Sequence, residues 1–421
     1  MRDGEHPVKQ RCSAACLCGF RKSTGTEREQ AMQETKKERE TAAEEKKQTD
    51  ELLTWYAENR RILPWREDPT PYHVWLSEIM LQQTRVEAGK AYYLRFLENL
   101  PDIASLAAAS EEVYLKLWEG LGYYSRVRNL HKAAVMIMEE YGGKMPDSPE
   151  KLEKLPGIGP YSAAAIASIA FQKPVVSVDG NLLRVFARMM EYGEDIKAPA
   201  ARKAALAYYG VGISKAKRPG DFNQALMDLG AGICLPNGEP LCLLCPWKER
   251  CLAHRDGRET AYPEVPPKKE RKKEKLTVFL IRSGDFLAVR RRGEDGLLAG
   301  LWEFPNVPGW LKEEEAEGVL AKMGLWKEDS GCPGELAEFS PGPKSRIETE
   351  ILRKLPTAKH IFSHIEWHMT GYEVQVPPFS EKEREKLRRS GIFLVTRKEL
   401  METYSIPSAF EKYKKIALEE A

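Results

Sequence analysis

The sequence lacks an apolar run long enough to span a membrane, and its N-terminus lacks the apolar core of a secretory signal. We therefore expect a protein of the reducing cytoplasm that contacts no membrane. The sequence also lacks an excess of one charge, because 65 basic and 63 acidic residues leave a formal net charge of +2. The overall charge gives no indication of a nucleic-acid partner, so any basic surface that binds one must be local.

Structural disulfides are not expected in that compartment, so the crowding of four cysteines into eighteen residues requires another explanation. Four thiols so close together are typical of a tetrahedral zinc site or of an iron–sulfur cluster. Zinc ribbons usually pair two short Cys-x2-Cys units, whereas this segment has one. The segment therefore predicts a metal site with the ligands Cys234, Cys242, Cys245 and Cys251.

The pattern of apolar residues divides the 421 residues into four parts. Residues 1–49 are rich in charge and lack apolar periodicity, which indicates a disordered or helical extension whose cysteines are incidental. Over residues 50–262, apolar side chains recur at spacings of three and four, as in a helical domain. The Pro- and Lys-rich stretch 263–275 is typical of a linker. Residues 276–421 alternate strand patterns with turns, which indicates a separate α+β domain.

Only a few elements are predicted individually. One short strand is expected in the helical domain, at residues 174–179. In the α+β domain the expected elements are strands at 276–281, 286–290, 371–376 and 391–395, and a helix at 313–323.

A Gly-x-Gly turn opens an apolar helix in the stretch Leu155-Pro-Gly-Ile-Gly-Pro-Tyr161. Backbone N–H groups at such a turn can bind an anion without reading sequence, and Gly157 and Gly159 leave room for a phosphate to approach. Many helical hairpins use Pro and Gly only to end one helix and start the next, so both interpretations stay open at this point.

Two carboxylates stand out by their surroundings. Glu78 lies among apolar residues in Trp75-Leu-Ser-Glu-Ile-Met-Leu-Gln-Gln83, where a carboxyl group tends to keep its proton, as a general acid must. The alternative is a glutamate on the solvated face of a helix. Asp179 ends a short apolar stretch in Val178-Asp-Gly-Asn181. It fits a helix N-cap, or a carboxylate placed to stabilise positive charge.

Aromatic residues alternate with arginine in Gly120-Leu-Gly-Tyr-Tyr-Ser-Arg126, a pattern that suits base stacking and phosphate contact. The alternative is a loop and helix whose aromatic pair belongs to the core.

Four of these motifs, in this order, resemble those of the helix-hairpin-helix DNA glycosylase superfamily, and within it the family that removes mispaired adenine. The resemblance covers about residues 50–255. It implies a multidomain protein with an all-α helix-hairpin-helix core, in which the four cysteines hold a [4Fe-4S] cluster. The family usually has six residues between the first two cysteines, whereas this chain has seven, in a Pro- and Gly-containing loop.

The resemblance also implies roles for individual residues. Glu78 is expected to protonate the departing adenine, and Asp179 to stabilise the cationic sugar. Tyr161 and Asn181 are expected to order water, Asp179 and the sugar. Related enzymes with lyase activity carry a lysine where this chain has Tyr161, so the resemblance implies a monofunctional hydrolase.

The expected substrate is double-stranded DNA with adenine opposite 8-oxoguanine or guanine, bound by a monomer. The adenine must be flipped out of the stack, and the residues expected to contact DNA are Arg66, Gln83, Tyr123, Gly157 and Gly159.

The C-terminal domain resembles a Nudix fold, because Gly300-Leu-Trp-Glu-Phe-Pro305 is similar to the start of a Nudix box. The acidic Arg-Glu-x-x-Glu-Glu helix that binds the catalytic metal is absent, and Gly318-Val-Leu-Ala stands in its place. The resemblance implies that this α+β domain recognises 8-oxoguanine, through Phe362, Ser363 and His364.

Two other functions share parts of this pattern. A bifunctional pyrimidine glycosylase-lyase of the endonuclease III type would need a lysine at Tyr161 and would not need the C-terminal domain. A Nudix nucleotide hydrolase with a DNA-binding tether would need the acidic helix.

Overall fold

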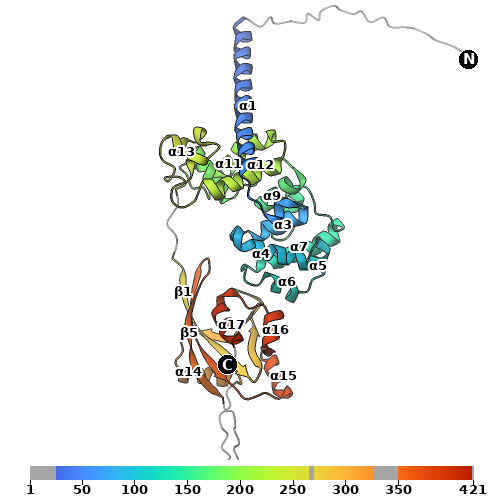
Figure 1. The fold of residues 1–421 in the computed structure, drawn as a ribbon, viewed down its shortest axis with the longest axis vertical. Helices are drawn as coiled ribbons and strands as arrows, with labels where there is room; N and C mark the ends of the chain where they lie inside the picture. The colour runs from blue at the N-terminus through green and yellow to red at the C-terminus, as the bar shows by residue number, and fades with distance from the viewer. Residues whose placement is uncertain (1–24, 265–269, 326–348, 420–421) are drawn as a thin grey trace, which may run out of the picture.

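The computed structural model describes residues 25–264, 270–325 and 349–419, with side chains from residue 40. Cys12, Cys16 and Cys18, expected to be incidental thiols, lie outside these residues. Figure 1 shows a helical body at the N-terminal side and a second body, built on a sheet, at the C-terminal side. In the part of the chain that is described, no helix is long and apolar enough to cross a membrane.

The helical body contains thirteen described α-helices and three short helical turns, as the alternation of apolar residues predicts. Proline or a capping side chain begins many of them, such as Thr70 and Ser148. The helices are α1 (Gly25–Asn59), α2 (Pro64–Glu67), α3 (Pro71–Met80), α4 (Val86–Asn99), α5 (Ile103–Ala108), α6 (Glu111–Trp118), α7 (Ser125–Tyr141), α8 (Pro149–Leu152), α9 (Pro160–Phe171), α10 (Gly180–Met189), α11 (Pro199–Lys215), α12 (Pro219–Asp228) and α13 (Leu252–Arg255), and the turns are η1 (Leu229–Ile233), η2 (Cys242–Leu244) and η3 (Lys248–Arg250).

Two apolar cores hold these helices. One core joins α2 to α9 and includes Trp75, Trp118 and Ile166, all fully buried. The other joins α1 with α10 to α13 and includes Leu52, Tyr209 and Trp247. The cavity described below lies between the two groups of helices, because its walls take residues from α3 and α9 on one side and from α10 and α12 on the other.

Two predictions for the helical domain need revision. Residues 174–179 form no strand; they run between α9 and α10, where Asn223 binds the backbone of the segment in place of a neighbouring strand. Helix α1 also continues across the boundary predicted at residue 50. Thr49 is buried and Gln48 donates a hydrogen bond to Tyr208, so residues before 50 already pack on the domain.

The C-terminal body is a seven-stranded mixed sheet with strand order β3-β2-β1-β6-β5; β4 pairs with β1, and β7 with β2. Helices α14 and α15 cover one face, and α16 and α17 the other, with a separate apolar core on each side. The elements are β1 (Lys272–Ser283), β2 (Phe286–Arg291), β3 (Trp302–Glu303), β4 (Asn306–Pro308), α14 (Glu313–Lys322), β5 (Glu350–Ile361), β6 (Ile365–Gln375), α15 (Glu381–Arg389), β7 (Ile392–Thr396), α16 (Arg397–Glu402), η4 (Ser408–Phe410) and α17 (Glu411–Leu418).

The four predicted strands and the predicted helix are present in this domain. Strand β1 begins at Lys272, however, so the last four residues of the predicted linker belong to the sheet. Strand β5 is absent from the prediction, because its polar, mostly exposed residues give no regular alternation. Helix α14 has carboxylates in its first turn and none after Glu317, in agreement with the missing metal-binding pattern.

The two bodies are in direct contact through α6. The Glu119 carboxylate accepts hydrogen bonds from the backbone N–H of Ile406, at 2.9 Å, and from the Lys414 ammonium, at 2.6 Å. Lys116 donates to backbone carbonyls of α16 and the loop after it. Leu301 of the sheet domain is fully buried in the core formed by α2 to α9. The contact therefore combines apolar burial with partly buried charge.

Candidate active site

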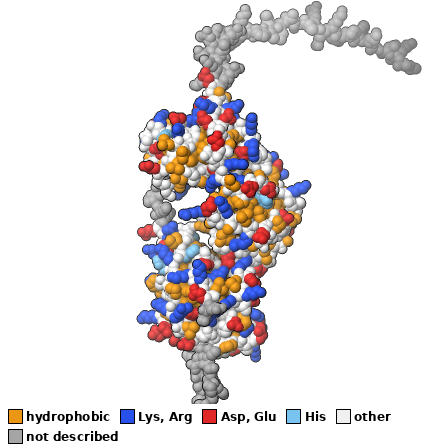
Figure 2. Space-filling view, in the orientation of Figure 1, with side chains coloured by type: hydrophobic (Ala, Val, Ile, Leu, Met, Phe, Trp, Pro, Cys, Tyr) orange, Lys and Arg blue, Asp and Glu red, His pale blue; other side chains and the backbone are white. Residues whose placement is uncertain are grey.

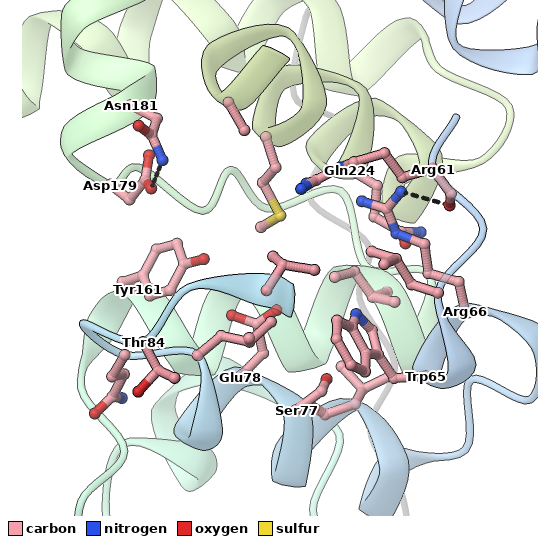
Figure 3. A pocket seen from close by; sticks show the side chains of 18 of the residues that line it. Arg61, Trp65, Arg66, Ser77, Glu78, Thr84, Tyr161, Asp179, Asn181 and Gln224 are labelled. Carbon is pink, nitrogen blue, oxygen red and sulfur yellow. Dashed lines mark hydrogen bonds between the residues drawn. The ribbon is translucent and has the colours of Figure 1, made fainter. Parts of the chain in front are cut away.

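A cavity of about 590 Å³ opens between the two helical cores. It is large enough for a purine nucleoside and lies at the N-terminal ends of α9 and α10. Figure 3 shows side chains from separate elements pointing into it, with Tyr161 between Glu78 and Asp179. The predicted site residues that line it are Arg66, Glu78, Gln83, Tyr161, Asp179 and Asn181.

Glu78 projects from the last turns of α3 into this cavity, beside Val74 and Leu81. It therefore does not lie on a solvated helix face. Burial raises the pKa of the Glu78 carboxyl from its ordinary value of 4.5 to about 7, a hydrogen bond with Tyr161 acts in the opposite direction, and the nearby Asp179 raises it further. The carboxyl group can thus carry or release a proton near neutral pH.

Tyr161 is the second residue of α9, directly after the helix-opening proline. Burial and the neighbouring Glu78 carboxylate raise the pKa of its phenol well above the ordinary value. The group is therefore a neutral hydroxyl that can orient a carboxylate or a water molecule, but it has no amine.

Asp179 has the geometry of both roles that the sequence leaves open. Its carboxylate caps α10 by accepting from the Leu182 N–H at 2.8 Å, and it accepts from the Asn181 amide at 2.9 Å. The same carboxylate faces the cavity (Figure 3). Burial raises the pKa of the Asp179 carboxyl above its ordinary value, and the two hydrogen bonds, together with the charge of Arg184, offset part of that rise. The cap thus fixes the direction of a carboxylate that remains open to the cavity.

An ion cluster at the cavity wall has no counterpart in the prediction. Arg66, expected to contact the base, lines the cavity, but its guanidinium donates two hydrogen bonds to Asp228, at 2.7 and 3.0 Å. Arg61 binds the same carboxylate at 2.7 Å. Asp228 stands 167 residues from Arg61 and closes an amphipathic helix, so no local pattern indicates the pairing.

The structure requires glycine at position 157 of the hairpin, but it leaves room for a side chain at position 159. Gly157 has φ +78°, and a Cβ there would lie 2.8 Å from the Asn129 Cβ, so both backbone and packing require glycine. Gly159 is the N-cap of α9, without a side-chain cap, and a Cβ there would meet no heavy atom within 4 Å. The helix N-terminus is thus open to an approaching group.

Tyr123 and the Phe362–His364 turn meet across the two bodies. The turn joins β5 to β6, and the Ser363 hydroxyl lies 3.0 Å from the Tyr123 hydroxyl. Tyr123, with φ +48°, is 46 % exposed, and Ser363 and His364 are exposed. Phe362 packs on Trp367. The residue predicted to fill the gap left by the flipped adenine and the turn predicted to recognise 8-oxoguanine therefore lie side by side.

Arg126 does not have the exposed, phosphate-binding position that the aromatic–arginine pattern suggests. Its side chain is buried, and its guanidinium donates to the carbonyls of Ile79, Met80 and Gln82. The first two carbonyls belong to the last turn of α3 and the third directly follows the helix, where a cation is stabilising. The residue therefore holds the helix that carries Glu78.

The four predicted metal ligands come together at one small cavity between α10 and the loop after η1. Burial raises the pKa of the Cys242 thiol to about 11, and the neighbouring thiols act in the same direction. Arg188 donates to the Cys234 Sγ at 3.2 Å, so a cation lies beside the cysteines. A second group within reach of one ion is Cys242, His254 and Glu259. Four convergent thiols with a cation beside them fit an iron–sulfur cluster.

Two parts of the chain match known families. Residues 76–209 match the family described as HhH-GPD superfamily base excision DNA repair protein, and they contain Glu78, Tyr161 and Asp179. Residues 277–415 match the NUDIX domain.

The chain is also similar to solved structures and to curated proteins. A thermostable thymine-DNA glycosylase aligns with a TM-score of 0.47 and 28 % identity over 51 % of this chain and 99 % of that chain. A trapped endonuclease III–DNA covalent intermediate aligns with a TM-score of 0.44 and 19 % identity, over 51 % of this chain and 98 % of that chain. The adenine DNA glycosylase of Rattus norvegicus is 35 % identical over 75 % of this chain and 67 % of its own length. The human adenine DNA glycosylase is 35 % identical over 75 % of this chain and 64 % of its own length. The Schizosaccharomyces pombe adenine DNA glycosylase is 34 % identical over 64 % of this chain and 72 % of its own length. On the similarity to these curated relatives, the chain belongs to the adenine DNA glycosylase family.

Proposed function

We propose that this chain hydrolyses the N-glycosidic bond of adenine paired with 8-oxoguanine or guanine in double-stranded DNA. The observation that carries the proposal is one cavity of nucleoside size faced by two carboxylates in different environments. Membership of the adenine DNA glycosylase family supports adenine as the base removed.

Glu78 is proposed to be the general acid. Adenine is a poor anionic leaving group, so protonation of its ring lowers the barrier to bond cleavage. A carboxyl with a pKa of about 7 is protonated in half of the molecules at neutral pH. Tyr161, in hydrogen-bond contact with it, keeps the carboxyl directed into the cavity.

Asp179 is proposed to stabilise the sugar. As the base departs, the sugar gains cationic character, and a carboxylate fixed nearby is most favourable at that moment. The hydrogen bonds from Leu182 and Asn181 hold the carboxylate before the reaction, so little reorganisation is needed. Asn181 is itself held by Arg184 at 3.0 Å.

The hydrolase is proposed to be monofunctional. A coupled lyase needs an amine that forms a Schiff base with the sugar. Among the described residues that line the cavity there are two arginines and no lysine, and the position expected for a catalytic lysine holds Tyr161. The endonuclease III-type alternative is therefore not favoured.

DNA is proposed to lie between the two bodies. Figure 2 shows basic side chains, in blue, on both bodies and at the edge of the hollow between them. The flipped adenine would enter the cavity, and Tyr123 with Gln83 would fill the gap in the stack. The Ser363 hydroxyl and the His364 ring are the polar groups proposed to read 8-oxoguanine.

The four cysteines are proposed to hold a [4Fe-4S] cluster. When bound, the cluster supplies a covalent cross-link that orders the loop from Cys234 to Cys251. The chain's own residues already tie this loop to α1, because Trp247 donates to the Gln48 carbonyl and Arg250 binds Glu51. We propose no step of base removal that uses the cluster.

A strand-cleavage assay tests the function. Duplexes with adenine opposite 8-oxoguanine, guanine or thymine are incubated with the protein and then treated with alkali. We expect abasic sites at the adenine of the first two duplexes, and little cleavage before alkali. Release of pyrimidines, or equal cleavage without alkali, would contradict the proposal.

A further inference from the structure

A second cavity, also of about 590 Å³, lies on the sheet of the C-terminal body, far along the chain from the proposed active site. Its lining includes Lys273, Lys275, Trp310 and His368. We call this set the sheet groove. None of these residues has a role in the function proposed above.

Strand register places the basic groups on one face. In the parallel β1–β6 pair, Lys275 is opposite His368. Because side chains alternate along a strand, Lys273 and Lys275 share a face. Glu274, between them, is turned toward Trp367 and accepts a hydrogen bond from its indole N–H at 3.0 Å. The basic side chains therefore form a row across two neighbouring strands.

The groove also contains the Glu274 carboxylate, which is paired with Lys272, so no described residue of the domain neutralises Lys273 and Lys275. Across the described ranges, neither Lys273 nor Lys275 has a carboxylate within ion-pair distance. The neighbouring Glu366 carboxylate is bound by Lys359 at 2.8 Å and by His368 at 2.6 Å. An anion from another molecule is the natural partner for two adjacent lysines in this state.

Trp310 gives the groove a fixed geometry. Its indole N–H donates to the His368 carbonyl at 2.9 Å, so the ring is held in place although it is 48 % exposed. The Lys275 ammonium lies 4.7 Å from the ring centre. A cation–π contact of this kind restrains the lysine head group while leaving it open to solvent.

The sheet groove begins one residue after the backbone contact that joins β1 to the turn proposed to read 8-oxoguanine. The Lys272 N–H donates to the His364 carbonyl at 3.0 Å, at the start of β1 and β6. His368 lies four positions after His364 along the chain, a distance of roughly 13 Å at about 3.3 Å per residue. The same length corresponds to about four nucleotides of one DNA strand, at about 3.4 Å each.

We propose that the sheet groove binds the phosphate backbone of the strand that carries 8-oxoguanine, within about five nucleotides of that base. The inference rests on the proposed function. Lys273 and Lys275 would contact the phosphates, and Trp310 would hold Lys275 in position and pack against a deoxyribose. The contact is independent of base sequence and acts on affinity and register, with no part in bond cleavage.

The test uses the full-length protein and a duplex with adenine opposite 8-oxoguanine. We expect Lys273→Ala/Lys275→Ala to weaken binding at least tenfold at physiological salt, and to lower the slope of log K against log salt by about two, since each phosphate contact contributes about 0.9. The single-turnover rate at saturating enzyme should not change. Trp310→Ala should weaken binding less than the double lysine variant does, and should lower the slope of log K against log salt by at most one.

A matched control and a modified substrate make the result specific. Lys322→Ala/Lys382→Ala removes two lysines elsewhere on the same domain and should leave the slope unchanged. Neutral methylphosphonates placed singly near the 8-oxoguanine should weaken the parent at one or two positions, and have no effect there on the double variant. If the double variant keeps the parent's affinity and slope, or if no methylphosphonate distinguishes the two proteins, the inference is wrong. Loss of base removal by the parent itself would overturn the proposed function instead.

Discussion

Glu78 and Asp179 are both partly buried carboxylates, yet their environments separate their proposed tasks. Glu78 has Tyr161 as its hydrogen-bond partner, whereas Asp179 accepts two fixed N–H donors. Donors favour the ionised form, and apolar burial favours the neutral form. One residue is thus adapted to donate a proton, and the other to offer a charge.

We predict that Glu78→Gln reduces the single-turnover rate of adenine removal by about 10²–10⁴, because the variant has no acidic proton to donate. Its affinity for the mismatched duplex should stay near that of the parent. Binding is measured by gel shift and the rate by alkaline cleavage. A variant with the parent's rate would remove Glu78 from the mechanism.

The raised pKa of Glu78 also predicts a pH dependence. The protonated form of Glu78 is the donor, so the rate should fall as the pH rises above about 7. The rate should also fall at low pH, where Asp179, whose own pKa is raised by burial, loses its charge. The folded-state pKa is above the ordinary 4.5, so the stability contributed by this group is present at low pH and lost as pH rises through about 7. Glu78→Gln should therefore raise Tm relative to the parent at pH 8, and not at pH 4. An equal Tm difference at both pH values would contradict this.

Asp179→Asn separates charge from capping. Asparagine caps a helix as well as aspartate does, so Tm should change little, whereas the rate should fall at least about 100-fold because the sugar cation loses its counter-charge. Asp179→Ala should show the same fall in the single-turnover rate and should in addition lower the free energy of unfolding by about 0.5–2 kcal/mol. Calorimetry on both variants measures the capping effect, and single-turnover kinetics measures the effect of the charge. Normal turnover by Asp179→Asn would show that Asp179 acts only as the N-cap of α10.

At this scale the sequence is informative for residues within compact motifs. Glu78, Tyr161 and Asp179 are predicted from such motifs, and they line one cavity. The partners that act from a distance are not predictable in this way: the pairing of Asp228 with Arg66, and the burial of Arg126 against carbonyls of α3, depend on contacts far apart in sequence. An arginine has the same appearance in a sequence whether it binds a phosphate or a helix end.

Among the elements, α1 and the cysteine loop depend on each other. Helix α1 contributes Leu52 to the second core and binds the loop through the Gln48 carbonyl and Glu51. The charge-rich composition of α1 gives no indication of this packing, since its apolar residues before Leu52 are few and show no helical periodicity. Strand β5 is not predicted from the sequence for a related reason. Pairing with β6 stabilises this polar strand, whose own residues show no alternation of apolar and polar side chains.

We predict about four irons per chain in the purified protein, and a yellow-brown colour. Cys245→Ser should lower the iron content and the DNA affinity more than it lowers the single-turnover rate at saturating protein, because none of the four cysteines lines the active-site cavity. The matched control is Ser214→Ala, on the exposed end of α11. One zinc and no iron in the parent would contradict the cluster.

For the whole molecule, the division of labour between the bodies can be tested by truncation after Arg271, just before β1 begins. The shortened chain retains every residue of the proposed active site and should still remove adenine. Its Tm should fall, because Leu301 is withdrawn from the first core and Glu119 loses its two partners in the sheet body, Ile406 and Lys414. It should also lose the preference for 8-oxoguanine over guanine.

Ser363→Ala is the finer version of this experiment. One hydrogen bond to a base edge contributes about 1–3 kcal/mol, so the variant should lose part of a preference of roughly ten- to a hundredfold. Single-turnover rates and affinities on the two duplexes give the ratio for each protein. A truncated protein that keeps the full ratio would show that this domain does not read the oxidised base.

The contact at Glu119 has a consequence for protein engineering. One carboxylate of the helical body serves both a backbone N–H and an ammonium of the sheet body, while Leu301 fills space in the core of the opposite domain. The sheet body is therefore not a module that can be transplanted by its linker alone. A chimera that joins it to another glycosylase would need an acidic residue at the position of Glu119 and a pocket for Leu301. Without them, the 362–364 turn would not be held at its position next to the helical body.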